Sequence, residues 1–426
     1  GNSLVDSGMS TSLLRMKSPN ETDYSTVFVA NMAISILVYL IIFLIAPLIA
    51  TFYEEAILTS VIRIYGLGFI LGAIKAVRVI RLTKALDFRR IAMFNVPGVV
   101  LSIIVAIWMA RNDWGVYSLV GMFLVNQTVS AIIYGFLVKE RVRLKFSMDR
   151  WKFHFRFGYK LTLSAQLNIV FENVYNVIIG KFYSTKSLGF YERAQAFNAY
   201  PAQVVLTVLS KVALPSFAHI KDDRERVRDG YRKVIGISFF GMCIIMCITG
   251  ALAKPLFLLV LGEQWLPAIP YFRILILAYI LYPVHSLNIS LLSLFDRSDL
   301  FLKIEIYKKV VASLALSLGY FFDIEGFLWS IVVSSFIGLG INTYYSKKLI
   351  NYSFFNQLAD LAPVFVIMGL VYVTVYMAST YLVMSPLATL AILGPGALLM
   401  IWALSLLTKL EVYLSLKVLA LNFIKR

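Results

Sequence analysis

Residues 27–52 read VFVANMAISILVYLIIFLIAPLIATF, a run without a single charged side chain. A helix rises about 1.5 Å per residue and the hydrocarbon core of a bilayer is about 30 Å thick, so about twenty apolar residues cross it. This stretch is therefore predicted to be a transmembrane helix. Working outward from it, eleven further stretches of similar composition follow. The twelve predicted spans are 27–52, 58–79, 93–110, 117–138, 158–180, 188–216, 232–253, 267–292, 300–320, 326–345, 360–380 and 387–408.

The overall composition agrees with this assignment. Hydrophobic residues make up 60% of the 426 residues, and the mean hydropathy is +0.80. A water-soluble chain of this length would have no means of hiding so much apolar surface. The sequence therefore predicts an all-α, polytopic membrane protein whose solvent on most sides is lipid.

The basic residues alternate from one link between spans to the next. The net charge is +17, and 31 of the 40 Lys and Arg residues lie in one alternating set of links that includes both ends of the chain. Only four lie in the opposite links, and five lie inside spans. Cytoplasmic loops carry such an excess of positive charge. We therefore expect the basic links and the C-terminus to be cytoplasmic, and we expect no binding of nucleic acid.

The residues that carry most enzymatic chemistry are sparse. Cys243 and Cys247 stand four residues apart in one apolar segment, and His154, His219 and His285 are too scattered to suggest metal ligands. The sequence holds no phosphate-binding Walker loop, no HExxH motif and no GxSxG motif. We therefore expect neither an enzyme nor a metal site nor a cofactor.

An internal repeat predicts a two-lobed organisation. A passage from Pro47 through Glu54 to Arg63 matches a passage from Pro255 through Glu263 to Arg273, at an offset of 208 to 210 residues. Duplicated bundles around a central cavity are common in transporters. The predicted segments are a remnant of a truncated transmembrane helix (1–14), an N-terminal lobe of four helices (15–138), a basic cytoplasmic linker (139–157), a C-terminal lobe of six helices (158–345), a terminal helix pair (346–408) and an amphipathic cytoplasmic tail (409–426).

The basic linker alternates aromatic with basic side chains from Trp151 to Phe157. Such a strip is typical of segments that lie on anionic lipid head groups. A specific docking site for an anionic lipid substrate is the alternative.

Polar residues concentrate inside two predicted spans. Asn168, Glu172 and Asn176 recur every four residues in the span 158–180, and this spacing places them on one side of a helix. Such groups are expensive in hydrocarbon, so they usually face a cavity or a partner. We predict that two neighbouring helices wall a water-filled cavity; a dry seam that joins helices is the alternative. The predicted cavity residues are Asn168, Glu172, Asn173, Asn176, Arg193, Gln203 and Lys211. Further cationic candidates are Arg63, Lys75 and Arg273. The alternative for Arg63 and Arg273 is that their side chains extend to the outer membrane interface and do not face the cavity.

The segments Asn173–Ser184 and Leu188–Ala194 are the most specific sequence motifs in the chain. Together with Leu86-Asp87-Phe88 and Leu261–Pro267, they resemble the polysaccharide transporter family, the oligosaccharide and teichuronic-acid flippases of the multidrug, oligosaccharidyl-lipid and polysaccharide exporter superfamily. The resemblance implies a two-lobed helical bundle of the multidrug-exporter type, with 12 complete transmembrane helices plus an N-terminal partial helix here. The first helix and most of the second would be missing. Asp296 is a departure, because the family usually has Gly there.

The resemblance also implies a function and a set of roles. The substrate would be an oligosaccharide on a polyprenyl pyrophosphate, moved across the bacterial cytoplasmic membrane for surface polysaccharide synthesis. The asparagines would line the sugar path, Arg193 and Lys211 would hold the pyrophosphate, and Glu172 would carry a coupling proton or cation. The expected partners are this lipid-linked oligosaccharide, membrane lipids, and polysaccharide polymerase and glycosyltransferases. A cation-coupled multidrug antiporter and an inactive or scaffolding membrane component are the alternatives.

Overall fold

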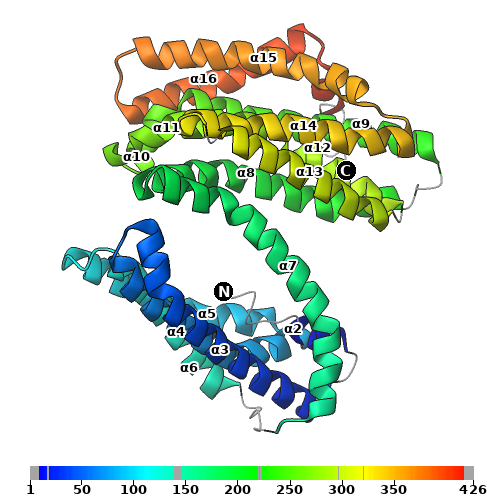
Figure 1. Ribbon diagram of the computed structural model, residues 1–426. Coiled ribbons are helices and arrows are strands. Elements are labelled where there is room, and N and C mark those ends of the chain that lie inside the picture. Colours follow the sequence, from blue (N-terminus) through cyan, green and yellow to red (C-terminus); the bar gives the residue numbers. More distant parts are fainter. Residues whose placement is uncertain are drawn as a thin grey trace. The chain divides into compact units, whose positions relative to one another are not determined.

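The computed structural model describes residues 9–16, 19–138, 145–218, 220, 223–295, 297–319 and 321–416 (Figure 1). Regular secondary structure in these ranges consists of helices alone, so the predicted all-α class is confirmed for them. The chain divides into two compact units, Gly1–Lys181 and Phe182–Arg426.

The first unit is built around a pair of long antiparallel helices that share an extensive contact, α3 and α4. A short helix, α2, packs on both of them, where Met9 and Leu13 are buried against Val27, Val77 and Ile80. All of this short helix except Arg15 falls in the segment 1–14, whose assignment as the remnant of a truncated transmembrane helix stays a prediction. The helices of this unit are α2 (Met9–Arg15), α3 (Glu21–Tyr53), α4 (Ile57–Lys84), α5 (Phe88–Arg111), α6 (Tyr117–Leu137) and α7 (Met148–Phe182), the last of which ends one residue beyond the unit.

Local sequence explains both ends of α3. Asn20 and Asp23 form a capping box, in which each side chain accepts a hydrogen bond from the other residue's backbone amide. Two orphan amides at the beginning of the helix are thereby satisfied. At the other end, Glu54 adopts the left-handed conformation (φ 60°) and closes the helix.

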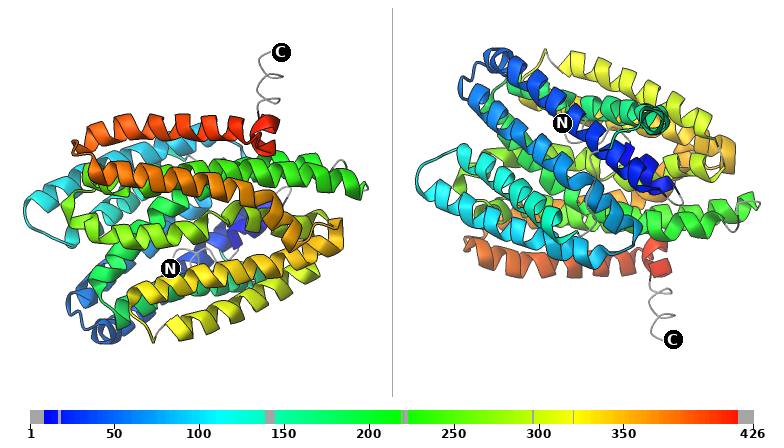
Figure 2. Two further views of the ribbon diagram at one scale, coloured as in Figure 1. Left: turned by 90° about the horizontal axis from the view of Figure 1, so that it is seen from above. Right: turned by 90° about the horizontal axis from the view of Figure 1, so that it is seen from below.

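The core of the second unit lies between α9 and α15, with α12 and α16 beside them. Phe239 of α9 packs on Phe365 of α15, with ring centroids 4.8 Å apart. Figure 2 shows α15 and α16 lying along each other. The elements of this unit are α8 (Thr185–Ala218), α9 (Arg224–Ala251), α10 (Ala253–Val260), the 3-10 helix η1 (Glu263–Ala268), α11 (Ile269–Tyr279), α12 (Tyr282–Leu294), α13 (Ser298–Gly319), α14 (Ile324–Ile350), α15 (Phe354–Tyr381) and α16 (Pro386–Leu407).

Two predicted spans differ in detail from the helices observed. The span 267–292 is divided into α11 and α12 just before Pro283, whose ring lacks an amide hydrogen and clashes with the preceding turn. The span 158–180 belongs to α7, which begins at Met148 and so includes the second half of the predicted basic linker. The lobe boundaries and the linker stay predictions.

Nine helical stretches among the described residues are long and apolar enough to cross a membrane, and one of them, Glu263–Leu292, joins η1, α11 and α12. Their outer surfaces are apolar: on α3, Leu44 and Leu48 are 72% and 69% exposed. In water this would be costly, whereas acyl chains accept it. The chain is thus a multi-pass membrane protein. The other three predicted spans coincide with α7, α8 and α13 and stay predictions.

The chain turns sharply after α16. Lys409 adopts the left-handed conformation (φ 49°), and the amide of Leu410 donates to the carbonyl of Ser405. This is the Schellman arrangement that ends many helices. Residues 411–416 are helical again, and residues 417–426 of the predicted tail lie outside the described residues. The amphipathic cytoplasmic tail stays a prediction.

Candidate functional site

The predicted cavity has its polar side chains on α7 and α8. Asn168 and Glu172 lie on α7 and Lys211 lies on α8, and the side chains of all three are outside the described residues. Up to Lys181, α7 belongs to the first unit, whereas α8 belongs to the second. The vestibule that would be bounded by these helices therefore stays a prediction.

The remaining predicted cavity residues are accessible or half-buried within their own units. On α7, Asn176 donates from its Nδ2 to Oδ1 of the exposed Asn173 at 3.3 Å, and the Asn176 Oδ1 is buried. On α8, Gln203 is exposed. The exposed guanidinium of Arg193 lies 5.2 Å from the ring centre of Trp265, a cation–π contact. Amide groups and a cation are thus available on these helices for a polar cargo.

Arg63 and Arg273, which the internal repeat matches, make the same kind of contact in their two units. The Nε of Arg63 donates to the carbonyl of Phe43 at 3.2 Å, and its guanidinium lies 4.2 Å from the centre of the Phe43 ring. The Nε of Arg273 donates to the carbonyl of Gly250 at 3.2 Å, and its guanidinium lies 4.6 Å from the centre of the Tyr376 ring.

Both accepting carbonyls lack the usual intrahelical donor. The donor for Phe43 would be the amide of residue 47, which is proline and has none. Gly250 stands in the last turn of α9, where carbonyls have no partner within the helix. Each arginine therefore satisfies a carbonyl that lipid would leave unpaired. Their role toward a cargo stays a prediction, as does that of Lys75, which is half-buried on α4.

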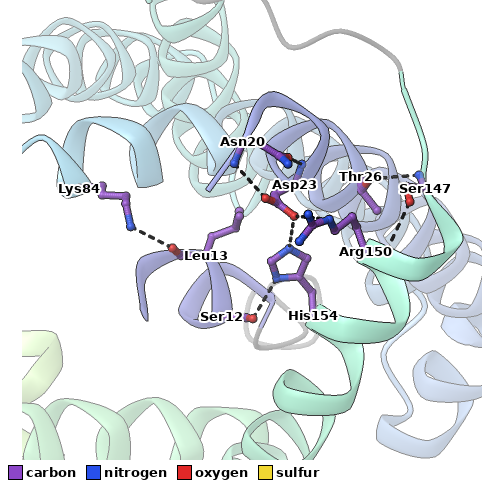
Figure 3. A network of polar contacts seen from close by, with 9 residues as sticks. All are labelled: Ser12, Leu13, Asn20, Asp23, Thr26, Lys84, Ser147, Arg150 and His154. Atoms are coloured by element: carbon purple, nitrogen blue, oxygen red, sulfur yellow. Dashed lines mark hydrogen bonds and ion pairs between the residues drawn. The ribbon is translucent and has the colours of Figure 1, made fainter. Parts of the chain in front are cut away.

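A polar network that the sequence analysis did not find joins α2, α3 and α7 (Figure 3). Asp23 and His154 are 1% and 0% exposed, and His154 Nε2 lies 3.3 Å from Asp23 Oδ1. The other ring nitrogen lies 2.9 Å from Ser12 Oγ, and Arg150 Nε lies 3.5 Å from the same Asp23 oxygen. One carboxylate therefore holds both a histidine and an arginine of α7, while it also caps α3.

The same region contains further basic contacts. The Arg81 guanidinium pairs with Glu21 at 2.6 Å and lies 4.3 Å from the centre of the Tyr24 ring. The ammonium of Lys84 donates to the carbonyls of Leu13 and Met16 at the end of α2, where a cation also complements the helix dipole (Figure 3). These contacts fix the short helix α2 to the beginning of α3 and the end of α4.

Burial lowers the pKa of His154, although its hydrogen bond to Asp23 acts in the opposite direction. His154 precedes the predicted span of α7, and the sequence placed it in an alternating strip of aromatic and basic residues. On the helix observed, the informative spacing is four, not two: Trp151 stacks on Phe155 with ring centroids 5.0 Å apart. The pair Asn20 and Asp23 is a local signal for the beginning of α3, but it does not indicate that this carboxylate is buried.

The second unit contains a cavity of about 610 Å³ between α9, α15 and the chain after α16. Arg232 of α9 binds both carboxylate oxygens of Asp360 on α15, and the Tyr352 hydroxyl donates to the same carboxylate at 2.7 Å. Burial raises the pKa of Tyr352, so its hydroxyl stays protonated as a donor. The charged residues that line the cavity are Asp229, Arg232, Lys233, Asp360, Lys409 and Glu411.

Comparison with known proteins gives a consistent set of similarities. Residues 1–270 match a family model described as "Polysaccharide biosynthesis protein". The teichuronic acid biosynthesis protein TuaB of Bacillus subtilis (strain 168) is 25% identical over 70% of this chain, and the lipopolysaccharide biosynthesis protein WzxC of Escherichia coli (strain K12) is 24% identical over 74%. The matches cover 62% and 65% of those two relatives, so the chain spans less than two thirds of their length.

A solved structure shares the fold. The inward closed conformation of the lipid II flippase MurJ superposes with a TM-score of 0.73 at 13% identity, over 97% of this chain and 88% of that one. The two-lobed bundle type expected from the sequence is therefore supported by a similarity of fold.

Proposed function

Because the chain belongs to the family of polysaccharide biosynthesis proteins, we propose that it moves a polyprenyl-pyrophosphate-linked oligosaccharide across the bacterial cytoplasmic membrane. The observation that carries the proposal is the family match over residues 1–270. Relatives named for the synthesis of teichuronic acid and lipopolysaccharide support a cell-surface glycan as the product. A solved neighbour named as a lipid II flippase supports a lipid-linked cargo.

The charge of the membrane interior supports an anionic cargo. Five Lys and Arg residues lie inside the predicted spans, and bases outnumber acids there. In a medium of low dielectric, a pyrophosphate gains more from such cations than it would in water. In this proposal Arg193 and Lys211 hold the pyrophosphate, while Asn168, Asn173, Asn176 and Gln203 contact the sugar. The lipid tail stays in the bilayer.

The remaining roles follow from the same proposal. Glu172 carries the coupling proton or cation, and the basic links and the C-terminus face the cytoplasm. A polysaccharide polymerase and glycosyltransferases consume and supply the cargo. No catalytic step on this chain is needed, because translocation makes and breaks no covalent bond.

The test is a flipping assay with the protein reconstituted in vesicles that contain a fluorescent polyprenyl-pyrophosphate oligosaccharide. A charge-assisted hydrogen bond contributes about 1.5–3 kcal/mol, so Arg193→Ala and Lys211→Ala should each slow flipping by about ten- to a hundredfold. Lys254→Ala removes an exposed charge outside the proposed cavity and serves as the matched control. Glu172→Gln should change the pH or cation dependence of the rate.

The proposal fails if both cation variants flip the lipid-linked sugar at the rate of the control. Transport of cationic dyes without flipping of the lipid-linked sugar would instead identify a multidrug antiporter. A protein that supports neither transport but restores surface polysaccharide to a flippase-null strain would be a scaffold.

A further inference from the structure

A cluster of polar side chains lies inside the second unit, away from the residues assigned to the cargo. It consists of His285 and Asn288 on α12, Ser335, Asn342 and Ser346 on α14, and Gln357 on α15, and is called the polar cluster below. Asn288, Asn342, Ser346 and Gln357 are buried, and His285 lies in the stretch Glu263–Leu292, which is long and apolar enough to span a membrane. Polar groups at such a place are costly and usually serve a function.

The contacts of His285 specify its protonation state. Its Nδ1 lies 2.9 Å from Nδ2 of Asn342, and its Nε2 lies 3.1 Å from Oγ of Ser335. An amide nitrogen only donates, so Nδ1 is the acceptor and carries no hydrogen. Nε2 then carries the hydrogen and donates to Ser335. The arrangement therefore holds a neutral imidazole.

The same pair of residues can also hold the charged imidazole. Asn342 is 1% exposed, and its Oδ1 is buried without a hydrogen-bond partner among the described residues. Turning the amide by 180° exchanges Oδ1 for Nδ2, so Oδ1 would then face Nδ1 of His285. A proton on Nδ1 would be donated to that oxygen, and the orphaned acceptor would be satisfied.

One cation lies near His285, and it is paired with an acid. Lys308 of α13 and His285 both lie beside Gly338. A methyl group added at Gly338 would lie 3.8 Å from His285 Cε1 and 3.9 Å from Lys308 Cε. Glu305 pairs with Lys308 at 2.9 Å and offsets its charge. The other helices that pack on α12 carry their charged residues at other positions. On α9 these residues lie within 224–233, and on α14 they are Glu325, Lys347 and Lys348. On α8 they are Lys186, Glu192, Arg193 and Lys211, and the side chain of Lys211 is outside the described residues.

The polar cluster leads from His285 to the cavity of the second unit. Ser346 donates to Oδ1 of Asn288, and Asn288 and Gln357 exchange hydrogen bonds of 3.0 and 3.1 Å between their amides. Gln357 also donates to the carbonyl of Tyr352 at 3.4 Å, and the hydroxyl of Tyr352 donates to Asp360 at the cavity wall. Water that enters from the cavity would find polar partners along this line.

We propose that His285 is a proton-binding site in which the amide of Asn342 turns to accept the hydrogen of the protonated imidazole. The proton comes from water on the cavity side, is bound at Nδ1, and returns by the same route. The inference rests on the proposed function for its use, because a proton that is bound and released on the cavity side can make lipid flipping depend on the pH of that side. It requires that the amide of Asn342 occupies both orientations.

The experiment measures protonation directly, so that its result does not depend on flipping. The protein is labelled with ¹⁵N-histidine, reconstituted in lipid nanodiscs, and studied by NMR between pH 8 and 4. The chain has three histidines, and His285→Gln, which keeps a hydrogen-bonding side chain, assigns the signal. Two variants of the proposed acceptor are compared with the wild type: Asn342→Leu, which removes it, and Asn342→Asp, which makes it an anion.

The expected result has opposite signs for the two variants. Wild-type His285 should convert from the neutral form with hydrogen on Nε2 to the imidazolium within this range. A hydrogen bond to a charged group changes an equilibrium by a factor of about ten to a hundred, or about one to two pH units. Asn342→Leu should lower the midpoint of this titration, by less than that amount because it also removes the hydrogen bond of the neutral form, and Asn342→Asp should raise it.

Two results would overturn the proposal. One is a His285 signal that stays neutral throughout the range in which the protein is folded. The other is a midpoint that neither variant moves in the stated direction. If either result occurs while the protein flips the lipid-linked sugar normally, the proposed function stands and the proton site at His285 is rejected. If His285 titrates as expected while the protein does not flip the lipid-linked sugar, the proton site stands and the proposed function is rejected.

Discussion

Replacing Arg63 by Met tests whether the arginine satisfies the carbonyl that Pro47 leaves without a donor. The substitution keeps an unbranched apolar stem and removes both the Nε–H bond to Phe43 (3.2 Å) and the cation–π contact (4.2 Å). An unsatisfied polar group costs about 1–3 kcal/mol and the cation–π contact contributes about 0.5–1 kcal/mol. We expect the free energy of opening of the α3–α4 pair to fall by about 2 kcal/mol.

A double-mutant cycle separates the two contributions. Pro47→Ala returns an amide hydrogen to the position that should donate to Phe43, so the carbonyl no longer needs the arginine. In that background Arg63→Met should cost only the cation–π contact and packing, about 1 kcal/mol. The predicted coupling between the two sites is therefore about 1 kcal/mol, above the average of about 0.6 kcal/mol for hydrogen bonds between membrane helices.

The assay is hydrogen–deuterium exchange of the protein in nanodiscs, read from peptides of α3 and α4. The matched control is the other copy of the repeat. There Arg273 binds the carbonyl of Gly250, whereas the amide that Pro255 lacks would have donated to the carbonyl of Ala251. Pro255→Ala should therefore not rescue Arg273→Met. The reasoning would be refuted if Arg63→Met lowered the free energy of opening equally in the wild type and in Pro47→Ala, because Pro47 would then not affect the contact of Arg63.

Two further predictions concern the first unit. His154 has a pKa lowered by burial from its ordinary value of 6.5, so its contribution to stability is full above about pH 6.5 and is lost as the pH falls through the folded pKa. In His154→Gln this pH dependence should vanish, as measured by thermal unfolding from pH 8 to 5; an unchanged dependence would assign it to another group. A methyl group at Gly68 would lie 2.1 Å from the ring of Phe123, which stacks on Tyr65, whereas one at Gly72 meets nothing within 4 Å. Gly68→Ala should therefore destabilise the protein by about 1–3 kcal/mol, whereas Gly72→Ala should stabilise it by up to about 1 kcal/mol, because alanine is the better helix former. Equal midpoints of unfolding for the two variants would contradict this prediction.

Hydropathy alone located the helices because the membrane restricts what can cross it. The predicted spans 27–52 and 117–138 agree within a few residues with α3 at its C-terminal end and with α6 at both ends. The break within the span 267–292 had a visible cause at Pro283, since proline in a long apolar run signals a break or a kink. The early beginning of α7 was hidden, because basic residues in the first turns of a helix lower its hydropathy.

The polar contacts were much harder to predict than the helices. The partner of His154 is 131 residues away, and the partner of His285 is 57 residues away, and neither separation has a sequence signature. The contact of Arg63 does have a sequence signature, because a proline in the preceding span frees a backbone carbonyl at a known position. The repeat aligns Arg273 with Arg63, but it did not predict the contact of Arg273, because Pro255 frees the carbonyl of Ala251 and not that of Gly250. Only interactions that follow from local chain geometry are accessible to this kind of reasoning.

The two native thiols are suited to a mapping experiment. Cys243 and Cys247 are 0% and 5% exposed in the core of the second unit, and neither forms a disulfide. A membrane-impermeant maleimide should therefore ignore them, and single cysteines introduced into the loops would report accessibility against a silent background. Both sides of the membrane can be assigned in this way without first removing a native residue.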